Sequence, residues 1–120
     1  MKTVLVVEDD KDWVDNWKHG INKEKIMLSF ASTIQEAEIL LSNCYFDAIV
    51  MDALLIDMET KVETMTFSLV EKIRSVFNYN GPIIATSSNS EYRKRLVEVG
   101  CDYQASKTEV FQKLSDVLGF

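Results

Sequence analysis

Short apolar runs alternate along this chain with segments in which apolar residues recur every three or four positions. The runs predict strands, because a strand buried on both faces of a parallel sheet needs no polar alternation. We place five strands, at residues 3–7, 25–31, 48–51, 82–86 and 102–105. The periodic segments predict five helices, because a 3.6-residue period puts such positions on one face. The first helix is expected at 11–21, the second after Ser32 or Thr33, and the third at 67–77. The fourth is capped by residues 87–90 and runs through Val99, and the fifth begins near Thr108.

Five strands alternating with five helices predict one doubly wound α/β domain over residues 1–120, because parallel neighbours need crossovers long enough to hold a helix. In such a sheet the carboxyl ends of all strands share one edge, where ligands bind. The polar residues that follow the strands are therefore expected to meet there, although they are scattered along the sequence: Glu8, Asp9, Asp52, Ser87 and Lys107.

The composition is that of an ordinary compact domain, and the net charge disfavours some classes of binding partner. The chain is 47% hydrophobic and 27% charged, and its net charge of −6 comes from 19 acidic and 13 basic residues. This balance disfavours direct binding to nucleic acid or to an anionic membrane surface. The apolar runs are too short to span a bilayer, and residues 1–3 lead into a strand and do not resemble a signal peptide, so we expect a cytoplasmic protein. Cys44 and Cys101 are expected to be reduced packing residues.

The three carboxylates expected at the sheet edge would repel one another. At about 4 Å and an effective dielectric constant of about 20, each like-charged pair costs on the order of 4 kcal/mol, so a proton or a cation must compensate. An oxygen-only site favours Mg²⁺. With the cation bound, Asp52 can remain ionised and attack phosphorus, while Lys107 and the Ser87 hydroxyl stabilise the phosphate oxygens.

Four stretches of the sequence, in order, resemble the signatures of the receiver domains of two-component response regulators. They are VLVVEDD at 4–10, FDAIVMD at 46–52, PIIATSS at 82–88 and GCDYQASK at 100–107. The stretch FASTIQEA at 30–37 also resembles the family's junction between strand two and helix two. The resemblance covers the whole chain and implies a flavodoxin-like (βα)5 sheet with strand order 2-1-3-4-5.

The resemblance also implies a function. Asp52 would accept a phosphoryl group from a histidine kinase or a histidine phosphotransfer protein, with Ser87 as the switch hydroxyl and Lys107 as the phosphate contact. The protein would be no enzyme beyond Mg²⁺-dependent self-phosphorylation from a phosphodonor and slow autodephosphorylation. The implied Mg²⁺ ligands are Glu8, Asp9, Asp52 and the backbone carbonyl of Leu54.

The sequence departs from the family pattern at several positions near the site. Thr108 stands where a proline usually follows the lysine, and a non-proline cis bond there would cost roughly 3–4 kcal/mol. Gln104 stands at the usual switch aromatic, with Tyr103 one step away. Asn89 matches a position that tunes dephosphorylation. The segment 57–65 lengthens the loop after the acceptor, as either a specificity surface or a tolerated insertion.

We expect a stand-alone receiver, monomeric or weakly dimeric, that signals through changed protein contacts on the face of helix four, strand five and helix five. The residues expected on that face are Glu91, Tyr92, Lys94, Arg95, Gln104 and Phe111. The alternative is a pseudo-receiver, a constitutive interaction module that is not phosphorylated. A phosphohydrolase resembling the haloacid dehalogenase family is disfavoured because Leu54 occupies the place of its second acid. A nucleotide-binding protein is disfavoured because no Gly-rich loop follows the first strand.

Overall fold

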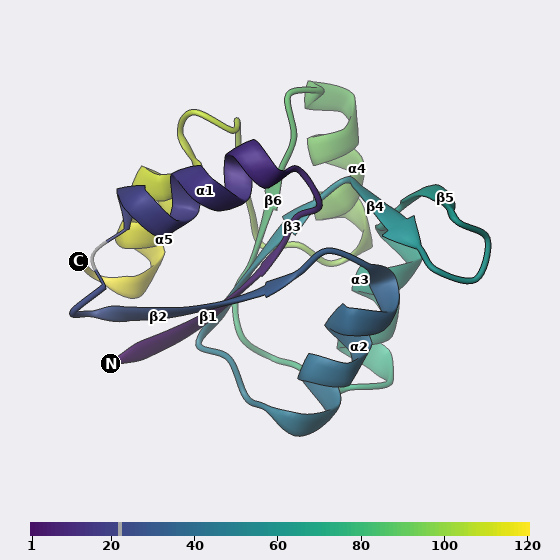
Figure 1. The fold of residues 1–120 in the computed structure, drawn as a ribbon, viewed down its shortest axis with the longest axis horizontal. Helices are drawn as coiled ribbons and strands as arrows, with labels where there is room; N and C mark the ends of the chain where they lie inside the picture. The colour runs from purple at the N-terminus through teal and green to yellow at the C-terminus, as the bar shows by residue number, and fades with distance from the viewer. Residues whose placement is uncertain (22) are drawn as a thin grey trace.

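The computed structural model describes residues 1–21 and 23–120. Over these residues it contains a five-stranded parallel sheet, a separate two-stranded hairpin and five helices (Figure 1). The elements follow the chain in the order β1 Lys2–Val7, α1 Lys11–Gly20, β2 Ile26–Ala31, α2 Ile34–Asn43, β3 Ala48–Asp52, β4 Leu54–Asp57, β5 Val62–Met65, α3 Phe67–Ser75, β6 Ile83–Thr86, α4 Ser90–Val99, β7 Tyr103–Ala105 and α5 Val110–Leu118.

The large sheet has the strand order β2-β1-β3-β6-β7, with every neighbouring pair parallel. When the hairpin strands are left out of the count, this is the predicted order 2-1-3-4-5, and the flavodoxin-like α/β fold class is confirmed. Residues 4–7 of β1 and 48–51 of β3 are all apolar and buried. Their continuous apolar runs result from burial on both faces.

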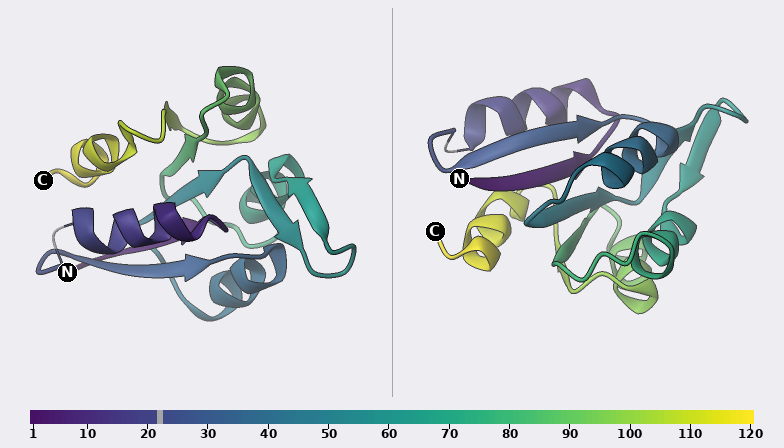
Figure 2. Two further views of the ribbon diagram at one scale, coloured as in Figure 1. Left: turned by 45° about the horizontal axis from the view of Figure 1, so that its top comes forward. Right: turned by 90° about the horizontal axis from the view of Figure 1, so that it is seen from below.

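Helices cover both faces of the sheet (Figures 1 and 2). Trp17 of α1 and Leu114 of α5 pack on one face, in the same apolar cluster as Val6 and Val50 of the central strands. The other face is covered by α2, α3 and α4, whose buried residues include Ala37, Leu69, Val70, Ile73 and Leu96. Both chain ends lie at the edge of the sheet where the parallel strands begin (Figure 2). The opposite edge is therefore left to the residues that follow the strands.

The segment expected to be a long loop after Asp52 forms the hairpin β4–β5 instead. Lys61 takes a left-handed conformation at its turn, with φ of 61°. The hairpin is tied to the start of α2 at two places. Ile56 forms a bridge with Thr33. The Gln35 side chain donates to Asp57 Oδ1 at 3.0 Å and accepts from the Met58 amide at 3.0 Å. The insertion is therefore an ordered part of the fold.

The boundaries of several other elements differ from the predicted ones by one or two residues. The third helix was expected to reach residue 77 but ends at Ser75, and Val76 is 61% exposed. The first helix ends at Gly20, the second, fourth and fifth predicted strands each begin one residue later than expected, and the last helix begins at Val110. Terminal turns carry few packing contacts, so periodicity defines them poorly.

Two loops that flank β7 lie at opposite edges of the sheet, with Lys107 after the strand and Gly100 before it. No cis peptide bond occurs in the described residues, so the Lys107–Thr108 bond is trans. Gly100 ends α4 with φ of 141°, a conformation that favours glycine. A Cβ there would also lie 3.2 Å from Cγ of Arg74, whose guanidinium donates to the Gly100 carbonyl.

In the described part of the chain no helix is both long enough and apolar enough to cross a membrane.

Candidate functional site

The residues predicted to meet at the carboxyl edge of the sheet all lie at or just after the ends of parallel strands. Glu8 and Asp9 come directly after β1, Asp52 is the last residue of β3, Ser87 follows β6, and Lys107 lies two residues beyond β7. Glu8 and Asp52 are 3% and 9% exposed. The structure therefore brings two nearly buried carboxylates to an edge of the sheet that also carries a lysine.

Three carboxylates form a compact cluster at this edge. One oxygen from each of Glu8, Asp9 and Asp52 lies within 4.8 Å of the others. Carboxylate oxygens are the ligands that Mg²⁺ takes in proteins, and a cation removes the repulsion between buried negative charges. The donor set therefore fits a hard divalent cation.

Lys107 supplies the positive charge in the cluster. Its ammonium group donates to Glu8 Oε1 and lies 3.3 Å from Asp52 Oδ2. The same ammonium lies 5.6 Å from the centroid of the Trp13 ring of α1. One lysine compensates part of the charge of three carboxylates, so the cluster keeps a negative potential.

The pKa of Asp52 responds to these neighbours. The net effect raises the pKa to about 8: burial is the largest cause, and the adjacent Glu8 contributes both a hydrogen bond and a like charge that also raise it. Lys107 and the Ala53 amide, which donates to Asp52 Oδ1 at 2.9 Å, act in the opposite direction. The metal-free site therefore holds a proton that a bound cation would displace.

Burial is also the main cause that raises the pKa of Asp9, followed by the charges of Glu8 and Glu63. Glu63 belongs to β5, in the hairpin, and was not among the predicted site residues. The hairpin therefore adds negative potential at the carboxyl edge. A sequence reading could have found Glu63 only by predicting that residues 54–65 fold back as a hairpin.

Ser87 is buried, and its hydrogen bonds run to its own loop and to α4. Its hydroxyl accepts from the Asn89 amide at 3.0 Å. Arg93 of α4 donates to its main-chain carbonyl at 2.5 Å. A movement of Ser87 toward Asp52 would therefore require these contacts to change, which would disturb the start of α4.

The remaining predicted residues take different places. Asn89 caps α4, with its side-chain oxygen accepting from the Glu91 and Tyr92 amides. Tyr103 and Gln104 are exposed, and the Tyr103 ring lies 5.1 Å from the Lys113 ammonium on α5. The predicted switch residues of β7 therefore do not contact Ser87 in this conformation.

Leu54 begins β4 and pairs with Met65. The Thr66 amide donates to the Ala53 carbonyl at 2.9 Å. Hydrogen-bonded pairs alternate along an antiparallel ladder, so the Leu54 carbonyl faces away from β5. It remains available as the fourth predicted oxygen ligand.

One member of the expected interaction face lies elsewhere. Phe111 packs edge-to-face against Trp17 of α1, with ring centroids 4.4 Å apart. Its ring therefore packs between α5 and α1 and does not lie on the expected interaction face. Glu91, Lys94, Arg95 and Gln104 are exposed, and Tyr92 is partly buried.

Thr66 is a site residue that the sequence reading missed. Its side chain is fully buried, and its hydroxyl donates to the main-chain carbonyl of Asp52 at 2.6 Å. This bond holds the backbone of the acceptor residue from the far end of the hairpin. A threonine fourteen residues after Asp52 carries no pattern that indicates such a contact.

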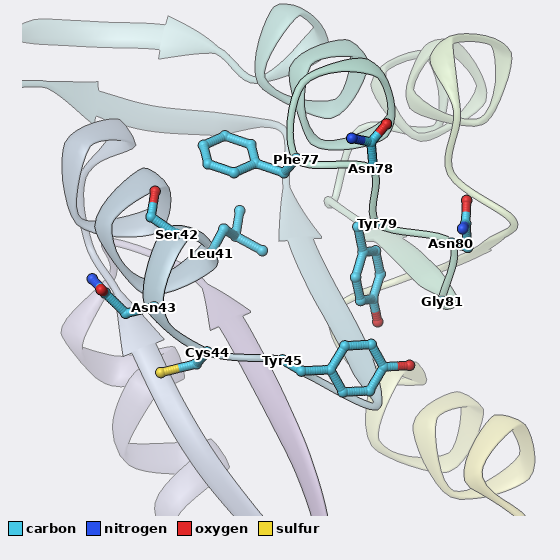
Figure 3. A pocket seen from close by; sticks show the side chains of 10 residues that line it. All are labelled: Leu41, Ser42, Asn43, Cys44, Tyr45, Phe77, Asn78, Tyr79, Asn80 and Gly81. Atoms are coloured by element: carbon cyan, nitrogen blue, oxygen red, sulfur yellow. The ribbon is translucent and has the colours of Figure 1, made fainter.

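Two open cavities lie at opposite edges of the sheet. One, of about 570 Å³, lies between the loops before β3 and before β6, where the Tyr45 and Tyr79 rings stand with centroids 6.0 Å apart (Figure 3). It is remote from the carboxylates. The other, of about 670 Å³, is lined by Glu8 and Asp9 together with residues of α1, α2 and the hairpin. The second cavity gives access to the acidic cluster.

Comparisons with known proteins agree on the fold. No protein-family model matches the sequence, and no curated protein sequence matches it. Among solved structures, the non-phosphorylated HemR receiver domain from Leptospira biflexa is 26% identical, with a TM-score of 0.79 over 100% of this chain and 96% of that one. The receiver domain of Francisella response regulator 1452 is 22% identical, with a TM-score of 0.81 over 99% and 98% of the two chains.

A two-component response regulator from Clostridium difficile is 20% identical, with a TM-score of 0.82 over 99% of this chain and 97% of that one. The structures that this chain resembles are thus response regulator receiver domains, and the resemblance extends over nearly its whole length.

Proposed function

We propose that this chain is a receiver domain, spanning residues 1–120, that accepts a phosphoryl group on Asp52 from a histidine kinase or a histidine phosphotransfer protein. The observation that carries the proposal is the position of Asp52. It ends a central strand beside two further carboxylates, and its Oδ2 atom lies 3.3 Å from the Lys107 ammonium. An acceptor carboxylate, an acidic cation site and a phosphate-binding ammonium are the groups that phosphoryl transfer to aspartate requires.

Each residue has a defined part in the reaction. Glu8, Asp9, Asp52 and the Leu54 carbonyl would hold Mg²⁺, which supplies positive charge to the phosphate oxygens when it is bound. An Asp52 carboxylate oxygen forms the new bond to phosphorus as the bond from phosphorus to the donor's imidazole nitrogen breaks, and that nitrogen then takes up a proton. The Lys107 ammonium leaves Glu8 and Asp52 to bind a phosphate oxygen. No other catalytic activity is proposed beyond slow hydrolysis of the aspartyl phosphate.

Phosphorylation would be transmitted through Ser87. When its hydroxyl turns to the phosphoryl group it leaves the Asn89 amide, and the Arg93 contact to its carbonyl shifts with it. The surface of α4, β7 and the adjoining part of α5 would then bind a downstream protein differently. A hundredfold change in the affinity of that partner corresponds to about 2.7 kcal/mol, within the range of allosteric coupling energies. The proposed partners belong to the cytoplasm, and the domain would act as a monomer or a weak homodimer.

A pseudo-receiver is the second candidate, and one observation favours it. The Tyr103 ring lies against Lys113 of α5, and Gln104 occupies the position next to it, so β7 offers Ser87 no aromatic ring in this conformation. Under this alternative the same surface would bind a partner without phosphorylation. The two candidates differ in whether Asp52 reacts.

Intact-mass measurement after incubation with Mg²⁺ and acetyl phosphate tests the proposal. We expect one added phosphoryl group on the wild-type protein, none on Asp52→Asn, and none on the wild type in EDTA. Asp57→Asn is the matched control, because it makes the same chemical change in the hairpin, where Asp57 accepts from Gln35. It should be modified like the wild type.

A wild-type protein that gains no phosphoryl group and also fails to bind beryllofluoride would overturn the phosphorylation proposal and leave the pseudo-receiver. Equal modification of the wild type and Asp52→Asn would overturn the assignment of the acceptor.

A further inference from the structure

Thr86, the last residue of β6, has a buried hydroxyl that lacks a hydrogen-bond partner. Thr86 as a whole is 3% exposed. In residues 1–21 and 23–120, its Oγ1 atom is the one buried side-chain nitrogen or oxygen without a partner. Because a buried unsatisfied polar group destabilises a fold, such a group needs a physical explanation.

The register of the sheet places Thr86 beside the proposed acceptor. Thr86 and Asp52 are direct partners in the parallel pairing of β3 with β6. Side chains alternate between the two faces of a sheet, and Val50 and Ile84, two residues earlier in each strand, both belong to the core on the α1 and α5 side. The Asp52 carboxylate and the Thr86 hydroxyl therefore project from the same face on adjacent strands. On the other side of Thr86 stands Ala105, which has no polar side-chain atom.

The oxygens of Asp52 have two other neighbours. Oδ1 accepts from the Ala53 amide, and Oδ2 lies 3.3 Å from the Lys107 ammonium, which also contacts Glu8. A cation held by the three carboxylates would displace the Lys107 ammonium from this cluster by charge repulsion. An ionised carboxylate has more acceptor sites than these neighbours use. The Thr86 hydroxyl is a donor at the position directly opposite Asp52 on the adjacent strand.

We propose that Thr86 is a positioning residue for Asp52, whose hydroxyl donates a hydrogen bond to the Asp52 carboxylate when the acidic cluster holds its cation. This hydrogen bond would fix the carboxylate plane, so that one oxygen faces the cation and the attacking oxygen faces the phosphodonor. The inference rests on the proposed function and adds one residue to its site.

Titration calorimetry with Mg²⁺ alone tests the inference without any phosphorylation. Thr86→Val keeps the shape of the side chain and removes the donor, and we expect it to weaken Mg²⁺ binding about tenfold, as loss of a hydrogen bond to a charged group does. Thr86→Ser keeps the donor and should bind within about threefold of the wild type. Thr3→Val is the matched control, because it makes the same change in a strand at the opposite edge of the sheet, where Thr3 contacts Asp47.

The melting temperature in EDTA provides a second readout. Thr86→Val should melt at or above the wild-type temperature, because it removes an unsatisfied hydroxyl. If the hydroxyl instead stabilised the fold, its removal would lower the melting temperature. If valine prevents folding, Thr86→Ala provides the comparison with Thr86→Ser.

Wild-type affinity in Thr86→Val, or equal losses in the valine and serine variants, would overturn the inference while leaving the proposed function intact. Failure of the wild-type protein to bind Mg²⁺ would overturn both.

Discussion

Replacing Asp52 with asparagine should stabilise the metal-free protein, and by more at pH 7 than at pH 5. The folded protein raises the pKa of Asp52 from 3.8 to about 8. Between these values the folded state holds a proton that the unfolded state has released. The free energy of unfolding therefore falls as the pH rises, because the unfolded state binds fewer protons.

The magnitude follows from proton linkage. One proton bound by the folded state but not by the unfolded state changes the free energy of unfolding by about 1.4 kcal/mol per pH unit. From pH 5 to pH 7 the Asp52 contribution should therefore fall by about 2–3 kcal/mol. The asparagine side chain of the variant does not titrate. The stability of Asp52→Asn relative to the wild type should rise by this amount, or by about 10 °C in melting temperature for a domain of this size.

Urea denaturation in EDTA at pH 5, 6 and 7 measures this difference. Asp57→Asn is the control, because the hydrogen bond from Gln35 lowers the pKa of Asp57, which is therefore ionised in both states across this range. Saturating Mg²⁺ should flatten the wild-type pH dependence, because the cation displaces the proton. A stability difference between Asp52→Asn and the wild type that stays constant, or shrinks as the pH rises, would refute the electrostatic reasoning.

Three further predictions concern the hairpin and the cysteines. Thr66→Val should lower the free energy of unfolding by about 1–3 kcal/mol, because it leaves the main-chain carbonyl of the acceptor residue without its buried donor, and an unchanged denaturation curve would contradict this. Gln35→Ala should speed hydrogen exchange at the Met58 amide while leaving the global unfolding free energy within about 1 kcal/mol, and exchange as slow as in the wild type would contradict the anchoring role. Iodoacetamide should modify exposed Cys44 in the native protein much faster than buried Cys101, whose thiol pKa is raised by burial to about 12, and equal rates would contradict the packing of Cys101.

The sequence was informative where burial on two faces dictates composition. Residues 4–7 and 48–51 are apolar because helices cover both sides of the central strands, and the first charged residue after each run marks the carboxyl edge. The sequence alone thus predicted the order of the five helices and of the five strands of the large sheet and, through parallel topology, that Glu8 and Asp52 would share one edge. The family resemblance then supplied the strand order.

The hairpin could not be predicted in the same way. Its strands are four residues each, and the burial of β5 does not alternate, because its first two residues are exposed and its last two are partly buried. Its position depends on contacts of Gln35 with Asp57 and Met58, which join residues more than twenty positions apart. Local propensity does not contain such contacts, so the segment was interpreted as a loop.

The parts played by Thr66 and Thr86 depend on register and burial. Threonine is common in strands and at helix starts, so neither residue is distinctive in the sequence. Thr86 lies beside Asp52 because β3 pairs with β6. Thr66 reaches the Asp52 carbonyl because the hairpin reverses the chain direction after β4. The position of Phe111 likewise depends on how α5 packs against α1.

Chemical mapping of the phosphoryl group tests most directly whether Asp52 is the acceptor. Borohydride converts an aspartyl phosphate to homoserine, which mass spectrometry of proteolytic peptides can locate after treatment with Mg²⁺ and acetyl phosphate. We predict homoserine at position 52 and at no other aspartate. Homoserine at Asp9 or Asp57, or a phosphoryl group that resists borohydride and remains on Ser87, would contradict the proposed function.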